Sequence, residues 1–120
     1  MSLDDSITAA IGAHGLWKGR LRAAIESGTD DMRTDIVRDD HQYDFGKWLH
    51  GADIDAQIRR SQHYGTCVEL HRRFHIAAAG VVSLVIAGKK QEASKALGTD
   101  QEFSRVSLDL TKAMLAWKAA

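Results

Sequence analysis

Two histidines stand four residues apart where a helix would be expected to bury aliphatic side chains. Steps of three and four along this segment trace one hydrophobic face, typical of a core helix. That face consists of Tyr64, Val68, His71, His75, Ala78, Val82 and Val85. The first segment carries a histidine in the same way, on a face made of Ile7, Ala10, His14, Trp17, Leu21 and Ala24. A buried imidazole is costly unless something satisfies its polar atoms, and a metal ion would satisfy all three.

The spacing of the paired histidines allows both rings to reach one ion. Residues four apart on an α-helix share a face and lie about 6 Å apart along the axis. His14 would then come from a facing helix. Three neutral imidazoles suit zinc, and on ligand type alone also copper, nickel or iron. The sequence therefore predicts a Zn²⁺ site formed by His14, His71 and His75.

Composition limits the classes of protein to which the chain can belong. Its 120 residues are expected to form a single domain, residues 1–120. The formal net charge is zero, so there is no basic footprint for nucleic acid or an anionic membrane. The longest apolar run, Ile76–Ala87, is shorter than the roughly 20 residues that span a bilayer. One cysteine, Cys67, excludes an internal disulfide and favours a cytoplasmic location, with a buried free thiol as its expected role.

The absence of proline and the spacing of apolar residues favour a helical chain. A polar loop is expected over Thr29–Asp35. The expected helices are Asp4–Ser27, Asp39–His50, Asp53–Ala87, Lys89–Leu97 and Asp100–Lys118. They predict an all-α fold, an antiparallel four-helix bundle with a short extra helix. Metal sites in such bundles are built from inward-facing side chains of different helices.

The order of these residues resembles the chemoreceptor zinc-binding domain family. Leu16 follows His14 by two positions, then comes Phe45-Gly46-Lys47-Trp48, and the pattern closes with His71-Arg-Arg-Phe-His75. The resemblance implies a zinc-binding regulatory domain of bacterial signal transduction, and not an enzyme. It also implies a cytoplasmic homodimer whose output partner is a chemoreceptor or a diguanylate cyclase.

Tyr43 stands where the resembling family has a cysteine ligand. A phenol has a reference pKa of about 10 and must lose its proton to bind a metal well. The fourth ligand could therefore be Tyr43, His41, a water molecule or an anion. A ligating imidazole usually donates its other ring N–H to a carboxylate or carbonyl. Carboxylates close enough in sequence are Asp40, Asp44 and Glu69.

Other candidate ligands fit less well. Cys67 is expected about 12 Å from His75 along the helix axis, too far for both to bind one zinc ion. His50 and His63 are expected at the surface.

Three further functions are alternatives. In a histidine phosphotransfer domain, a lysine would have to flank the His14 imidazole from a position one residue earlier than Lys18. One residue turns a helix by about 100°, so Lys18 would point elsewhere. A zinc-dependent hydrolase could use an open three-histidine site. Glu69, two residues from His71, would however point to another side of the helix. A di-iron oxygen carrier would need bridging carboxylates and more histidines than this face offers.

Overall fold

The computed structural model describes residues 2–28 and 33–120, and every regular element in them is a helix. The helices are α1 (Leu3–Gly15), α2 (Trp17–Ser27), α3 (Thr34–Arg38), α4 (Asp44–Leu49), α5 (Ala56–Arg59), α6 (Gln62–Ile86), α7 (Lys90–Ala96) and α8 (Glu102–Ala119). The predicted all-α class is confirmed. Within these residues, no helix is both long and apolar enough to cross a membrane.

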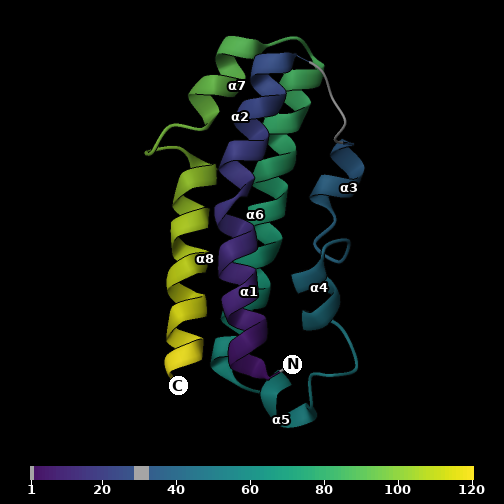
Figure 1. Cartoon of the computed structure of the whole chain (residues 1–120), viewed down its shortest axis with the longest axis vertical. Coiled ribbons are helices and arrows are strands. Elements are labelled where there is room, and N and C mark those ends of the chain that lie inside the picture. Colours follow the sequence, from purple (N-terminus) through teal and green to yellow (C-terminus); the bar gives the residue numbers. More distant parts are fainter. Residues whose placement is uncertain (1, 29–32) are drawn as a thin grey trace.

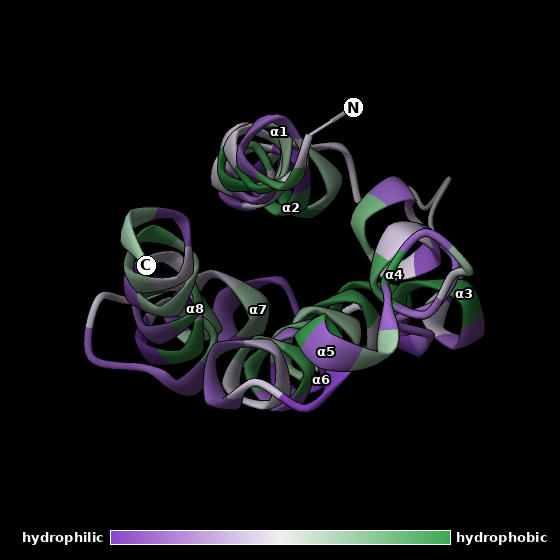
Figure 2. Ribbon diagram, turned by 90° about the horizontal axis from the view of Figure 1, so that it is seen from below, coloured by the Kyte–Doolittle hydropathy of each residue, from purple (hydrophilic) through white to green (hydrophobic). Residues whose placement is uncertain are grey.

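Three long rods and one column of short helices surround the core. In Figure 1, α1 and α2 follow each other as one rod, α6 and α8 form two more, and α3 lies above α4 on the opposite side from α8. Seen along its length, the molecule has α1–α2 facing α6, with α8 on one side between them and α3–α4 on the other (Figure 2). The α1–α2 rod and α6 run in one direction, α8 and the α3–α4 column run in the other, and α7 is a short extra helix near one end (Figure 1). The antiparallel four-helix bundle with a short extra helix stays a prediction.

The first predicted helix is divided. The sequence predicted one helix over Asp4–Ser27, whereas α1 ends at Gly15 and α2 begins at Trp17. At the junction the Leu16 N–H donates to the Ala13 carbonyl at 3.2 Å, a tighter turn than the α-helix makes. Gly15 and Gly19 flank this junction, and glycine is a weak helix former.

The predicted helix Asp39–His50 is shorter than expected. Helix α4 covers only Asp44–Leu49, because the chain turns before it: the Asp39 carboxylate accepts a hydrogen bond from the His41 N–H at 2.9 Å. The predicted loop Thr29–Asp35 was also wrong at its end, where Thr34 and Asp35 begin α3. The part of that loop at residues 29–32 lies outside the described residues.

The predicted helix Asp53–Ala87 is two helices. Asp55 caps α5 by accepting from the Ile58 N–H at 2.8 Å, and Ser61 caps α6 by accepting from the Tyr64 N–H at 3.2 Å. Two N-caps mark two separate starts. Gly65 lies within α6 without interrupting it.

The buried side of α6 is wider than the predicted face. Cys67 is completely buried, as expected of a free core thiol, whereas Val68 on the predicted face is only partly buried. Phe74, next to His75, is also completely buried. Helix α6 packs against α8 on one side and α3 on the other, so two neighbouring strips of its surface are covered. This arrangement surrounds His71 and His75 with packed side chains.

Candidate metal centre

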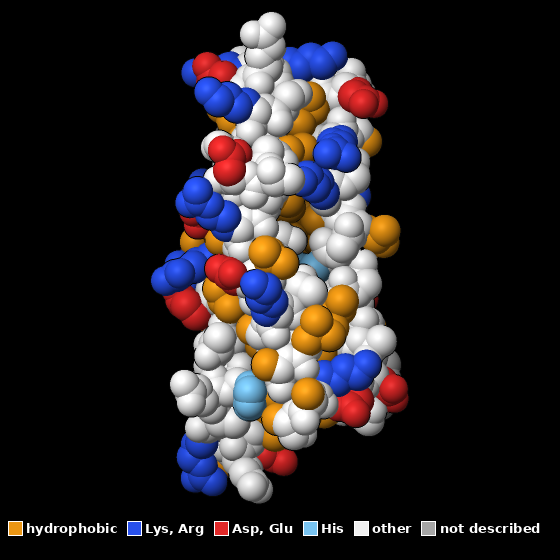
Figure 3. Space-filling model, turned by 90° about the vertical axis from the view of Figure 1, so that its left-hand side faces the viewer, with side chains coloured by type: hydrophobic (Ala, Val, Ile, Leu, Met, Phe, Trp, Pro, Cys, Tyr) orange, Lys and Arg blue, Asp and Glu red, His pale blue; other side chains and the backbone are white. Residues whose placement is uncertain are grey.

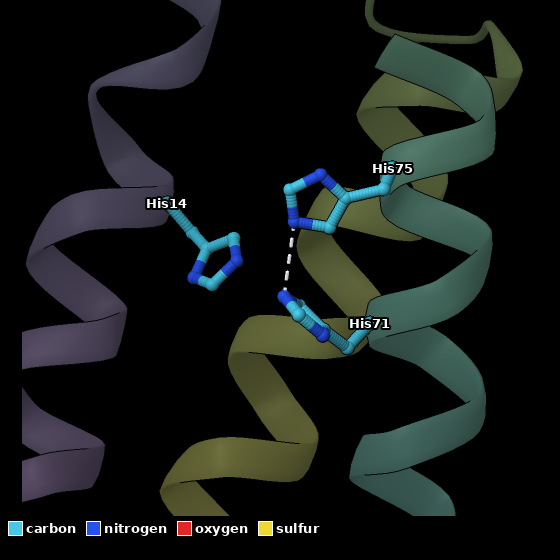
Figure 4. A group of neighbouring side chains, drawn as sticks. All are labelled: His14, His71 and His75. Carbon is cyan, nitrogen blue, oxygen red and sulfur yellow. Dashed lines mark hydrogen bonds between the residues drawn. The ribbon is translucent and has the colours of Figure 1, made fainter. Parts of the chain in front are cut away.

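The structure brings the three predicted histidines together. His14 comes from the last turn of α1, and His71 and His75 come from the middle of α6. Their rings point toward one another across the core (Figure 4). His14 is 6 % exposed and the other two are fully buried. One ring nitrogen of each can be chosen so that the three lie within 4.8 Å of one another.

Backbone carbonyls fix two of the rings. His14 Nδ1 lies 2.8 Å from the Ala10 carbonyl oxygen, and His75 Nδ1 lies 3.0 Å from the Val37 carbonyl oxygen. A carbonyl only accepts, so Nδ1 of each ring carries the hydrogen and donates it. The Nε2 atoms of His14 and His75 are therefore left with their lone pairs free for a metal.

His71 completes the group through its own Nε2 atom. This atom lies 3.0 Å from His75 Nε2 (Figure 4). Because His75 Nε2 has no hydrogen, the His71 Nε2–H must donate to it in the metal-free protein. The other nitrogen of His71, Nδ1, is buried without a hydrogen-bond partner in the described part of the chain. A metal ion bound at His71 Nε2 would require the hydrogen on that atom to move to Nδ1, and such an incompletely satisfied imidazole pair in a core suits a metal site.

Burial keeps the three rings neutral. It lowers the pKa of His14 to about 4 and that of His71 to about 2, and it lowers the pKa of His75 as well. The charge of His75 would lower the pKa of His71 further, while the Val37 carbonyl works in the opposite direction on His75. Neutral imidazole is the form that binds metals, so at neutral pH no proton has to be removed from a charged ring.

The donor set fits zinc. With Zn–N bonds of about 2.0–2.1 Å, two nitrogens of a tetrahedral site lie about 3.3–3.4 Å apart. The 3.0 Å between the Nε2 atoms of His71 and His75 is close to this separation. Three imidazoles leave one tetrahedral position for another ligand.

Aromatic rings enclose the histidines. Phe74 and Phe45 contact His14 edge-on, with ring centroids 4.9 and 5.6 Å away. Trp17 contacts His75 in the same way at 5.6 Å. These side chains hold the imidazoles in place and exclude water from most of the site.

Tyr43 lies beside the histidine cluster. Its ring is parallel to that of His75, with centroids 5.5 Å apart, and meets Trp17 edge-on at 5.1 Å. Together with His14, Trp17 and Arg20, it lines a hollow of about 600 Å³ between the α1–α2 rod and the Gln42–Trp48 segment. The hollow offers water or a small anion a route to the cluster. Ligation by the Tyr43 oxygen stays a prediction.

In the described part of the chain, backbone carbonyls and not the three carboxylates considered from the sequence hold the rings; Asp40 lies against His41 and His50. Glu69 binds Arg72 and Arg73 on the outside of α6, at 2.6 and 3.1 Å, and Asp44 is exposed. The carbonyls of Ala10 and Val37 accept the ring hydrogens instead. A backbone atom leaves no signature in residue type, so sequence reasoning had no means of finding it.

The remaining histidines lie away from the cluster. His63 is exposed, as expected. His50 was expected at the surface but is half-buried, and His41 stacks on it with ring centroids 3.8 Å apart. His41 thus belongs to a different group, with Asp40 and His50.

A family comparison agrees with this geometry. The family model of the chemoreceptor zinc-binding domain matches residues 14–82, more than half of the chain, from the first histidine of the cluster to beyond the last. The chain belongs to the chemoreceptor zinc-binding domain family. No curated protein and no solved structure matches it. As a chemoreceptor zinc-binding domain it is a zinc-binding sensor domain of signal transduction, and its buried histidine triad is able to hold the metal.

Proposed function

We propose that His14, His71 and His75 bind one Zn²⁺ ion through their Nε2 atoms. The observation that carries this proposal is the pair of hydrogen bonds from Nδ1 of His14 and His75 to backbone carbonyls, which leave two buried lone pairs next to the third ring. Tyr43, a water molecule or an anion completes the coordination from the side of the hollow.

Zinc then controls the contact between two rods of the bundle. Its ligands come from α1 and from α6, so the ion joins elements that are far apart in sequence. Without it, the His14 ring on α1 meets the His71 ring on α6 edge-on, with ring centroids 5.1 Å apart. Zinc occupancy therefore stabilises one arrangement of α1 against α6, and an attached output unit can respond to that arrangement.

The output unit that we propose is a bacterial chemoreceptor or a diguanylate cyclase, in the cytoplasm, because these accompany the family resemblance. We also propose that the domain acts as a homodimer. Helix α8 exposes Leu108 and Leu115, which are seven residues apart and so lie on one side of the helix. Figure 3 views the molecule from the α8 side, where hydrophobic side chains reach the surface. Light scattering with and without zinc tests this; a monomer under both conditions contradicts it.

Metal analysis after purification without a nickel column tests the zinc site. The expected result is one zinc ion per chain that remains after desalting. By mass action, free zinc at a hundred times its dissociation constant stabilises the fold by about 2.7 kcal/mol. For a chain of this size that corresponds to a rise in Tm of roughly 10 °C.

Two variants make the test specific. His14→Gln removes the α1 ligand and should abolish both the retained zinc and the Tm rise. His63→Gln changes an exposed histidine outside the cluster and should behave as the wild type. A wild-type protein without zinc whose Tm ignores added zinc would contradict the proposal.

A further inference from the structure

A second group of metal-binding side chains lies outside the histidine triad. Asp40 and His41 precede α4, and His50 follows it. The three residues each offer a ligand atom, and these atoms lie within 4.8 Å of one another. Asp40 and His50 are half-buried and His41 is exposed.

The fold, and not chance surface proximity, holds Asp40 and His50 in place. A Cβ atom on Gly46 would collide with the Asp40 carbonyl oxygen, so α4 can press against the Asp40 peptide only because residue 46 is glycine. At the other end of α4, the Tyr64 hydroxyl donates to the Leu49 carbonyl at 2.7 Å. This contact fixes the backbone that carries His50.

The two imidazoles share one carboxylate. His41 Nε2 lies 3.7 Å from one oxygen of Asp40, and His50 Nε2 lies 3.6 Å from the other. Both distances are too long for a well-formed hydrogen bond. His50 Nε2 is also buried without a hydrogen-bond partner in the described part of the chain. The three side chains thus lie close together without satisfying one another's hydrogen-bonding atoms.

These distances are close to those between ligands of a metal ion. Zn–N and Zn–O bonds of about 2.0–2.2 Å place two tetrahedral ligands about 3.3–3.5 Å apart. A contraction of a few tenths of an ångström would bring each nitrogen to this distance from the carboxylate. The His41 and His50 rings are nearly parallel, at 10°, so one must tilt for their lone pairs to converge. The side chain of His41 is 58 % exposed and free to do so.

We propose that Asp40, His41 and His50 form a second divalent-metal site that takes Zn²⁺ or a similar transition-metal ion. Two imidazoles and a carboxylate are a donor set that such ions favour. Water completes the coordination on the exposed side. The site binds more weakly than the buried triad, because it has fewer imidazoles and must move His41 to close.

The second site is independent of the first. None of its ligands belongs to the triad, and it needs no change in the core. Its segment nevertheless continues directly into Tyr43, whose ring stacks on His75. A metal held by Asp40 and His41 would fix the start of this segment beside the first site.

Zinc titration of the zinc-loaded protein tests the second site. Equilibrium dialysis against zinc chloride at micromolar to millimolar concentrations is expected to give a second bound ion per chain. Histidine side-chain ¹⁵N NMR should show the ring nitrogens of His41 and His50 shifting as this ion binds. His41→Gln changes an exposed side chain, so the fold is expected to survive, and circular dichroism checks that it does.

His41→Gln should weaken the second binding at least about tenfold, in line with the loss of one of three ligands. His63→Gln, the matched control, should retain it. The proposal is overturned if the wild type binds no second ion, or if His41→Gln and His63→Gln bind it equally. His14→Gln separates the two sites: it should keep the weak ion while losing the tight one. Failure of the triad to bind zinc would therefore leave this test intact.

Discussion

Acid should destabilise the metal-free domain through its buried imidazoles. Burial lowers the pKa of His14 to about 4 and of His71 to about 2, and it also lowers that of His75. In the unfolded chain a histidine has a pKa of about 6.5. Below pH 6.5 the unfolded chain therefore binds protons that the folded chain does not. Stability that is present at higher pH is lost as the pH falls, until the folded-state pKa values are reached.

The size of the effect follows from these pKa values. Between pH 8 and pH 5.5, each imidazole that stays neutral in the fold lowers the free energy of unfolding by about 1.4 kcal/mol. His14 and His71 together account for about 3 kcal/mol, and His75 acts in the same direction. Proteins of this kind have total stabilities of about 5–15 kcal/mol, so the loss should be easy to measure.

Urea unfolding followed by circular dichroism, in the presence of a chelator at both pH values, measures this loss. His71→Leu removes one of the imidazoles, so it should lose about 1.4 kcal/mol less than the wild type over the same interval. The test compares how much unfolding free energy each protein loses between the two pH values, so a change in stability at pH 8 caused by the substitution does not affect it. His63→Gln, at an exposed position, should lose as much as the wild type. Equal losses in the wild type and His71→Leu would refute the reasoning, because the ring at position 71 would then be charged within the fold.

Two other substitutions test the surroundings of the triad. Tyr43→Cys should tighten zinc binding by roughly tenfold or more, since a thiolate binds zinc better than a phenol. Competition with a chelator measures the affinity, and Tyr43→Phe is the control. An unchanged affinity in Tyr43→Cys would mean that position 43 does not face the metal. Gly46→Ala should destabilise the fold by about 1–3 kcal/mol, because its Cβ would collide with the Asp40 carbonyl. Its control is Gly12→Ala in α1, where a Cβ meets no atom within 4 Å and about 1 kcal/mol of stabilisation is expected. Urea unfolding measures both, and similar stabilities for the two variants would contradict the predicted collision.

The triad could be predicted because it follows from helix periodicity. A spacing of four fixes His71 and His75 on one face, and the apolar neighbours of His14 fix the side on which it lies. The structure confirms that all three are buried. The same counting misplaced Val68, because α6 is covered by neighbours on two sides and a single face underestimates its buried surface.

The second group could not be predicted in this way. His41 and His50 are nine residues apart and meet only because α4 is short and presses against the loop before it. That close approach depends on Gly46, whose role is visible only when the neighbouring backbone is known. The start of α6 could have been predicted, since Ser61 is a favourable N-cap residue, although the sequence analysis did not use it.

The hydrogen bond between His75 and the Val37 carbonyl fixes the tautomer of His75 without depending on the side chain at position 37. Every amino acid supplies the same main-chain oxygen, so position 37 can change its side chain through evolution while the imidazole keeps the same tautomer. What must be inherited is the path of α3, and with it the apolar contacts that seat this short helix on α6. Substitutions that shift α3 would thus alter proton placement at the metal ligand without changing any residue able to carry a charge.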